Sequence, residues 1–300
     1  MRIPPWTIAL SALAFIAGPA LSQNAGSLDE VPGLLKSPEA KAVWAEQMEG
    51  RPAPDHLGTR DLAGLDGELL TQLLLPEIPP ARITLLGARQ WAQYPGHIVA
   101  LACYGDAPPV RSESRCETGD GAQMLGVLRV DDGGAVRLVS RLRLDTDVEW
   151  PMLTWEPGSP LQMEEAGESP MPQRWERFDL AAYHLSPDSP PALGLRGVWS
   201  EGYAGGGGFW SALYLFELRD GALELVFGAG MSMYRDIAGD WNPDGTREHH
   251  IEDWARVLIV EPRVHHGYRD LQVRERGDRG GRGGDLYRWS PAAHSYRRVD

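Results

Sequence analysis

Residues 213–227 read LYLFELRDGALELVF, two apolar runs joined by the tetrapeptide Arg219-Asp220-Gly221-Ala222. An Asp-Gly pair accepts the positive φ angles of a tight reversal, so this stretch predicts an antiparallel β-hairpin. Apolar residues such as Leu215 and Phe216 fall on both faces of the first run, which indicates strands that are covered on both sides. The chain is therefore expected to build its core around a sheet.

A second stretch follows the same plan, with LGVLRV at 125–130, the turn Asp131-Asp132-Gly133-Gly134 and VRLV at 136–139. An apolar strand precedes each hairpin, at 98–103 and at 193–198. This likeness predicts an internal duplication. The alternative is that any two hairpins look alike.

Short apolar runs separated by turn residues continue from Ile83 to the end of the chain. Before them, Ser37-Pro38-Glu39 predicts the start of a helix that ends at Gly50, and a second helical stretch covers 67–75. We therefore expect a mainly β fold, α+β at the N-terminus, with antiparallel hairpins in a sandwich-like or partly propeller-like body. Strands are expected at 98–103, 124–130, 136–144, 192–199, 211–218, 223–227, 255–260, 270–276, 286–289 and 296–299.

Composition divides the chain into five segments. Glycine, proline and glutamate are concentrated in residues 151–174, which predicts a long exposed connection there. The glycines of 205–208 predict a flexible hairpin loop, because no helix pattern or Lys-Ser/Thr follows them as in a phosphate-binding loop. The expected segments are a signal peptide at 1–22, a helical region at 23–80, a first β unit at 81–150, the connection at 151–174 and a second β unit at 175–300.

The first residues have the features of a secretory signal peptide. Arg2 precedes the apolar run 8–17, and the small residues Ala20 and Ser22 precede Gln23. Roughly 20 apolar residues are needed to span a bilayer, and this run is shorter. We expect export with cleavage after Ser22, a periplasmic or secreted location, and no transmembrane segment after cleavage.

Charge and composition exclude several classes of protein. The 300 residues include 29 Lys and Arg against 42 Asp and Glu, and 42% are hydrophobic. That balance is typical of a folded soluble protein and not of a disordered tail or a polytopic membrane protein. A net charge of −13 also argues against a nucleic-acid partner, since phosphate binding needs a basic surface.

Cys103 and Cys116 are the only two cysteines, and both lie in the part of the chain that export would carry outside the cytoplasm. An oxidising compartment favours a disulfide between them. The alternative, Cys103 as a catalytic nucleophile, would need a thiolate that export tends to oxidise.

Residues 239–248 read GDWNPDGTRE and place oxygen-bearing side chains at alternating positions around a sharp turn at Gly245. Ca²⁺ prefers six to eight oxygen ligands, and this spacing lets several converge on one point. The stretch resembles the short calcium loop of FG-GAP/VCBS-type repeats, over about ten residues and once only. That resemblance implies a Ca²⁺ cofactor and says little about the fold. The implied ligands are Asp240, Asn242, Asp244, Thr246 and Glu248.

A bare reverse turn is the alternative for this stretch. Proline pre-sets the φ angle of the turn at position 243, and Gly245 accepts a left-handed conformation. The turn explains Asn242 to Gly245, but it explains neither Asp240 nor Glu248.

Histidines and serines give weaker evidence of a functional site than the stretch 239–248 does. The pairs His249-His250 and His265-His266 flank the expected strand 255–260, and we interpret them as solvated loop residues. No nucleophile elbow occurs, since Gly197 and Gly202 are one residue too far apart around Ser200. Catalytic residues are therefore not identified, and an enzyme is the less favoured interpretation.

Aromatic residues beside glycines suggest recognition, because rings supply contact area at small entropic cost. Core packing is the alternative for most of them. We expect a non-enzymatic binding protein, stabilised by calcium if the loop holds an ion, that recognises a protein or glycan in the cell envelope. The alternatives are an exported hydrolase of cell-wall or extracellular polymer, and an envelope accessory or inhibitor protein. The candidate binding residues are Tyr203, Phe209, Trp210 and Trp241.

Overall fold

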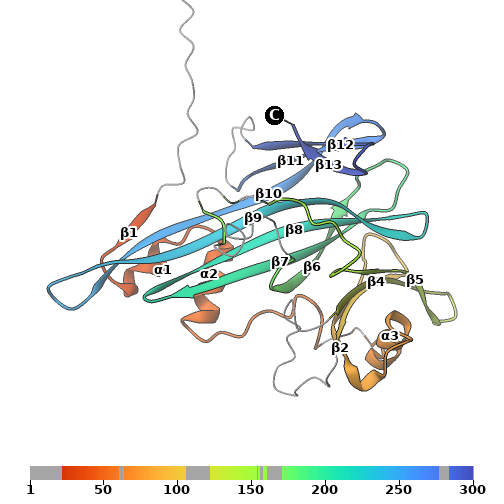
Figure 1. Cartoon of the computed structure of the whole chain (residues 1–300), viewed down its shortest axis with the longest axis horizontal. Helices are drawn as coiled ribbons and strands as arrows, with labels where there is room; N and C mark the ends of the chain where they lie inside the picture. Colours follow the sequence, from red (N-terminus) through yellow and green to blue (C-terminus); the bar gives the residue numbers. More distant parts are fainter. Residues whose placement is uncertain are drawn as a thin grey trace, which may run out of the picture.

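The computed structural model describes residues 22–60, 62, 64–105, 122–153, 155, 158–160, 171–276 and 284–299. Two antiparallel sheets make up most of this part of the chain, and short helices lie near its N-terminal end (Figure 1). The predicted mainly β fold is thus confirmed.

The smaller sheet is a meander of four strands in the order β2-β3-β4-β5. Its β4–β5 turn is a type I turn closed by Gly134 at φ +82°, and Asp131 Oδ1 accepts hydrogen bonds from the backbone of Gly133 and Ala135. One face of the sheet packs against α3, whose Leu70 and Leu74 are fully buried. The elements are α3 (Gly67–Leu74), the 3-10 helix η2 (Pro80–Arg82), β2 (Ile83–Gln90), β3 (His97–Tyr104), β4 (Ala122–Val130) and β5 (Val136–Arg143).

The larger sheet has nine described strands in the order β13-β12-β11-β10-β9-β8-β7-β6, with β1 alongside β10. Its middle strands are long, at 14, 20 and 19 residues for β8, β9 and β10, and Figure 1 shows them as hairpins that project well beyond the smaller sheet. The strands are β1 (Gln23–Ala25), β6 (Arg174–Tyr183), β7 (Ala192–Tyr203), β8 (Gly206–Arg219), β9 (Ala222–Trp241), β10 (Arg247–His265), β11 (Tyr268–Glu275), β12 (Asp285–Ser290) and β13 (Ser295–Arg298).

The turn from β8 to β9 has the predicted Asp-Gly geometry. Asp220 and Gly221 have φ angles of +49° and +81°, the pair of positive values that a two-residue type I′ hairpin requires. Leu218 pairs with Leu223 and Leu215 with Phe227 across the hairpin. The stretch that predicted a hairpin therefore forms one.

Strand β10 changes partner part-way along its length. Residues 247–255 pair with β9, and from Arg256 onward the strand pairs with β11. The second half of β10 therefore carries β11–β13 over one face of β7–β9, where Leu213, Phe227 and Trp289 share a buried cluster. The smaller sheet covers the opposite face, where Leu125 packs in one cluster with Trp175 and Tyr214. The middle strands are thus covered on both sides, as their sequence predicted.

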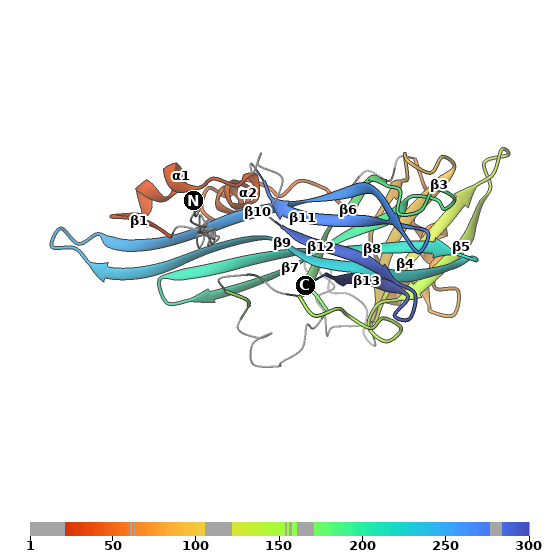
Figure 2. The same cartoon turned by 90° about the horizontal axis from the view of Figure 1, so that it is seen from above.

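The far half of the long hairpins is covered on one face by α1 (Val31–Leu34) and α2 (Pro38–Gln47) (Figure 2). Strand β1 extends the sheet beside β10, and the 3-10 helix η1 (Leu28–Glu30) joins it to α1. Asp253 Oδ2 of β10 accepts hydrogen bonds from the backbone of Lys36 and Ser37, at 2.6 and 2.8 Å. The Ser37 hydroxyl in turn caps α2 by accepting from Ala40 N. The predicted helices at 37–50 and 67–75 are therefore present, and α2 is tied to the sheet at its N-terminal end.

Two expectations about the strands and loops are wrong. The glycines of 205–208 do not form a flexible loop, because Gly206 to Gly208 belong to β8 and only Ala204 and Gly205 lie in the turn. The connection after residue 151 is not fully exposed, since Trp155 is 1% exposed and its Nε1 donates to the carbonyl of Ser211. Residues 161–170 of that connection lie outside the described part.

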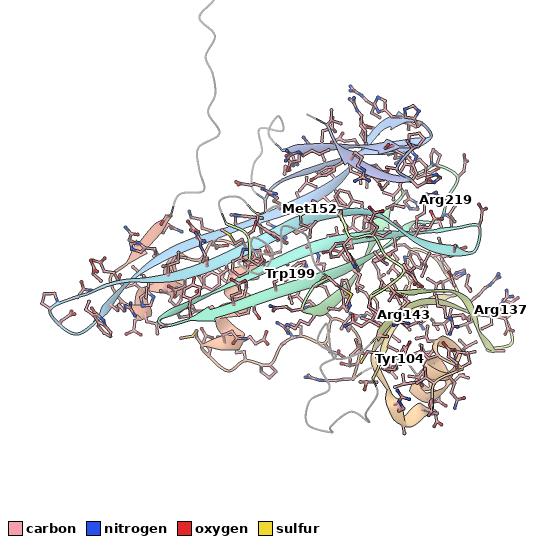
Figure 3. The ribbon with its side chains drawn as sticks, in the orientation of Figure 1. Tyr104, Arg137, Arg143, Met152, Trp199 and Arg219 are labelled. Carbon is pink, nitrogen blue, oxygen red and sulfur yellow. The ribbon has the colours of Figure 1, made fainter. Side chains whose placement is uncertain are left out.

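A buried ion pair links the central hairpin to β11. Glu217 is 1% exposed and accepts hydrogen bonds from Arg219 Nη2 at 2.7 Å and from the Tyr268 hydroxyl at 2.9 Å. Burial and the bond to Glu217 raise the pKa of Tyr268 to about 12. The Arg219 guanidinium, labelled near the β8–β9 turn in Figure 3, lies 5.1 Å from the centre of the Trp289 ring. Charge and aromatic contacts therefore hold the β8–β9 hairpin and the β11–β12 pair together.

We expect Glu217→Ala to lower the free energy of unfolding by about 3 kcal/mol, because it leaves Arg219 charged and partly buried without this carboxylate. Glu224→Ala is the matched control, since Glu224 pairs with the same arginine at 3.1 Å but is exposed, and its loss should cost less than about 1 kcal/mol. Urea denaturation of the purified variants measures both. Equal losses of unfolding free energy in the two variants would contradict the assignment of Glu217 as the more stabilising partner of Arg219.

Candidate ligand-binding hollow

A row of residues without side chains opens the face of the sheet beneath α2. Gly202 of β7 pairs with Gly207 of β8, and Gly207 pairs with Asp236 of β9. A Cβ atom added at Gly202 would meet no atom within 4 Å. Gly202 therefore leaves open space near Asp236, at the end of the hairpins where α2 forms the cover, whereas a Cβ atom at Gly207 would lie 3.0 Å from the Glu201 carbonyl oxygen.

The space is a hollow of about 550 Å³ between α2 and the β7–β8 hairpin. Trp44 and Val43 of α2 line its upper side, and Phe209 and Tyr234 line the sheet side. Leu28 and Met48 stand at its edge, 40% and 51% exposed. The hollow is thus largely apolar and aromatic and has exposed apolar residues beside it.

A buried Asp–His pair lines the same hollow. His249 Nδ1 lies 2.8 Å from Asp236 Oδ1, and each residue is 7% exposed. Burial raises the pKa of Asp236 above its ordinary value of 3.8, although the hydrogen bond and charge of His249 act in the opposite direction. The ionised carboxylate only accepts hydrogen bonds, so Nδ1 of His249 carries the hydrogen.

Strand alternation brings these groups to one face. Tyr234 and Asp236 are two residues apart on β9, and Phe209 and Gly207 are two residues apart on β8, so all four face α2. Ile251 is the β10 partner of Asp236, and His249 precedes it by two residues. His249 is therefore the diagonal neighbour of Asp236, within reach of its side chain.

A second hollow of about 430 Å³ lies between α2, residues 51–54 and the strands β6–β9. It shares Val43, Phe209 and Tyr234 with the first hollow. Acidic and basic residues both line it, including Glu46 and Arg177. Its charge therefore does not select one class of ligand.

The four aromatic residues that were predicted to bind a ligand do not form one site. Phe209 lines both hollows. Tyr203 is partly exposed and donates its hydroxyl hydrogen to the backbone carbonyl of Asp236 at 3.1 Å. Trp210 also lines the second hollow but is 2% exposed, packs in the central core and donates to the Gly158 carbonyl. Trp241 is 69% exposed at the end of β9 and lines neither hollow.

The predicted calcium loop is the turn between β9 and β10, and most of its polar groups bond to one another. Asn242 N donates to the Thr246 carbonyl at 2.8 Å, and Gly245, at φ +86°, donates to the Asn242 carbonyl at 3.0 Å. Asp244 Oδ1 accepts from the Thr246 backbone and hydroxyl, which holds the pKa of Asp244 below its ordinary value. The Asn242 side chain donates to the Gly26 carbonyl of the segment after β1. This is a type I turn followed by a left-handed glycine, the same turn that joins β4 to β5.

Calcium binding at this turn stays a prediction. Asp240 is exposed near the end of β9, and Glu248 lies in β10. Within the residues that the structure describes, no group of three or more His, Cys, Asp or Glu side chains is placed to hold a metal ion.

The histidine pairs differ from their interpretation as solvated loop residues. Both pairs do fall near the ends of β10, but His249 is buried against Asp236. His265 Nδ1 lies 2.7 Å from Asp270 Oδ1, and Asp270 is 2% exposed. The physical reason is that each of these histidines is a strand residue facing an acid on the same or the neighbouring strand.

One of the two cysteines lies in the described part of the chain. Cys103 lies in β3 and is 4% exposed, whereas Cys116 falls outside the described residues. The Cys103–Cys116 disulfide stays a prediction, as does the signal peptide, since residues 1–21 also fall outside.

No family model, curated protein or solved structure matches this chain. Its function must therefore be argued from the site itself. Of the helices in the described ranges, none is long and apolar enough to cross a membrane.

Sequence reasoning missed Asp236 and His249. The strand 222–241 was expected to end at residue 227, so Asp236 was not placed opposite β10. Met231 and Met233 continue the apolar alternation of a longer strand, but Gly228 and Gly230 interrupt the apolar pattern before them.

We expect Asp244→Ala to lower the midpoint of thermal unfolding slightly, by the same amount with calcium and with chelator, because it removes two hydrogen bonds of the turn. Asp240→Ala on the same hairpin should have little effect in either condition. A calcium-dependent rise of the wild-type midpoint that both substitutions abolish would instead establish the ion site.

Asp236 should also contribute a pH dependence of stability. Its pKa is raised above 3.8 in the folded protein, so the folded state binds more protons than the unfolded state between 3.8 and the raised value. The free energy of unfolding of the wild type relative to Asp236→Asn should therefore fall as pH rises through that window. Urea denaturation at a series of pH values measures this difference, with Asp240→Asn as the exposed control, and a difference that rises with pH would contradict the assignment.

Proposed function

We propose that this chain is an exported, non-catalytic binding protein, periplasmic or secreted, that holds part of its ligand in the hollow beneath α2. The observation that carries the proposal is the glycine row at Gly202 and Gly207, which keeps space open between an aromatic wall and a buried polar pair. Concave, mostly apolar spaces with a few polar groups are where proteins bind ligands. The signal-peptide pattern of residues 1–22 supports export.

The size and lining of the hollow support a ligand site. Ligand pockets are typically about 300–1,000 Å³, mostly apolar, with a few polar groups that orient the ligand. This hollow of about 550 Å³ has walls from Trp44, Phe209 and Tyr234 and one polar pair.

The exposed edge favours a partner larger than the hollow. Leu28 and Met48 are apolar and exposed beside the opening, where a partner protein would cover them. We therefore favour a protein of the cell envelope that inserts one side chain. A glycan is the alternative, and it would be identified by competition with soluble sugars.

An exported hydrolase is the second candidate, because a histidine oriented by a carboxylate is the arrangement of a general base. The Asp236–His249 pair has this arrangement and lines the hollow. A hydrolase would cleave para-nitrophenyl acetate or labelled peptidoglycan at a rate that His249→Gln abolishes. If the protein only binds its ligand, we expect no hydrolysis of these substrates that depends on His249.

The uncharged dye Nile red tests whether the hollow accepts an apolar ligand. We expect its fluorescence to rise on binding, and Gly202→Phe to weaken that binding at least about tenfold, because the new ring would fill the hollow. Gly202 has no steric conflict at its Cβ position, so the variant should fold.

Gly33→Phe is the matched control for this experiment. Gly33 is an exposed residue of α1 whose Cβ position is equally open, and it does not line the hollow. Its affinity for the dye should equal that of the wild type. Equal loss in both variants, or dye binding that Gly202→Phe leaves unchanged, would remove the hollow as the ligand site.

A further inference from the structure

The hollow beneath α2 is lined by a buried acid and by no fixed cation. Asp236 contributes a carboxylate, and none of the described residues that line the hollow is a lysine or arginine. His249 is the only lining residue that could carry a positive charge, and it is bonded to Asp236. The site thus has an electrostatic preference for a positively charged group.

The buried pair presents hydrogen-bond acceptors to the hollow. With the Nδ1 hydrogen of His249 bonded to Asp236 Oδ1, the uncharged form of the ring leaves Nε2 as an acceptor. Within the described ranges, this is the one hydrogen bond that either side chain makes. Asp236 and His249, each 7% exposed, therefore present acceptors to a donor in the hollow.

Aromatic rings complete the site. Trp44, Phe209 and Tyr234 line the hollow from three different elements, α2, β8 and β9. Ring faces attract ammonium groups, most strongly when the cation is desolvated. A carboxylate beneath several rings is a favourable combination for a cation that also carries N–H donors.

The nearest basic side chains are engaged elsewhere. Arg247 lies against Gly205, where its Nε donates to the Gly239 carbonyl and its guanidinium lies 5.4 Å from the centre of the Trp241 ring. Arg235 alternates with Asp236 along β9 and pairs with Glu252 at 2.6 Å. Neither residue lines the hollow.

We propose that the hollow binds an organic ammonium group, which donates hydrogen bonds to Asp236 and His249 while Trp44, Phe209 and Tyr234 enclose its carbon chain. This inference rests on the proposed function and gives it a ligand chemistry. The ammonium group belongs either to a free amine or to a lysine side chain of a partner protein. The edge formed by Leu28 and Met48 favours the lysine.

Three probes of nearly equal size and different charge test the inference on the wild-type protein. Benzylammonium, benzyl alcohol and benzoate are titrated at pH 7.5 by isothermal calorimetry or ligand-observed NMR. We expect benzylammonium to bind at least about tenfold more tightly than benzyl alcohol, and benzoate to bind most weakly. This comparison needs no variant, so a folding defect cannot obscure it.

A matched pair of variants then locates the charge. Asp236→Asn should lower the affinity for benzylammonium by about tenfold or more and leave that for benzyl alcohol nearly unchanged. Asp240→Asn removes the same charge from an exposed position on the same strand and should leave both affinities unchanged. Circular dichroism verifies that both variants are folded.

The source of the ammonium group is resolved by a further titration. Nα-acetyl-lysine methylamide presents a lysine side chain in a peptide context, whereas benzylammonium is a free amine. Asp236-dependent binding of the lysine derivative supports a partner protein, and binding of benzylammonium alone supports a small amine.

The inference is overturned if benzyl alcohol or benzoate binds as tightly as benzylammonium, or if Asp240→Asn weakens binding as much as Asp236→Asn. In those cases Nile red binding that Gly202→Phe abolishes would leave the proposed function standing. If neither the dye nor any of the three probes binds, the proposed function fails as well.

Discussion

The exchange of partners along β10 is the constraint on which the rest of the structure depends. One half of this strand continues the sheet of β7–β9, and the other half pairs with β11 and leaves that sheet at Ala255. The first half of β10 pairs with β9, and the second half pairs with β11. This change of partner divides the long hairpins into two regions. One region is a three-layered core, and the other is a two-layered extension covered by α2 (Figure 2).

The two regions use the same strands for different purposes. In the core, Trp199, Trp210, Met233 and Trp254 form a row across four strands and are almost fully buried. Trp199 is seen near the middle of the long strands in Figure 3. In the extension, Gly202 and Gly207 lie in one row with Asp236, and only Asp236 of these three has a side chain on the α2 side. The well-packed core therefore supports an extension that contains a hollow.

Local signals predicted much of this fold. The turns at Asp131 and Asp220, the cap at Ser37 and the apolar strands beside the turns depend on residues that are neighbours in sequence, and these elements formed where expected. The candidate site depends on pairing between residues far apart, so it was not predicted. Phe209 was the one site residue that sequence reasoning selected. Asp236 and His249 become neighbours only through the register of β9 and β10, which includes a bulge near Arg247.

The open position at Gly202 has a consequence for how ligand size could be selected. The hollow is shaped by the backbone of paired strands, and its floor does not depend on a loop that would have to become ordered. A substitution at Gly202 would therefore change the capacity of the hollow in steps set by side-chain volume while the backbone stays in place. In the proposed binding site, the residue at position 202 would therefore set how long a ligand the hollow accepts.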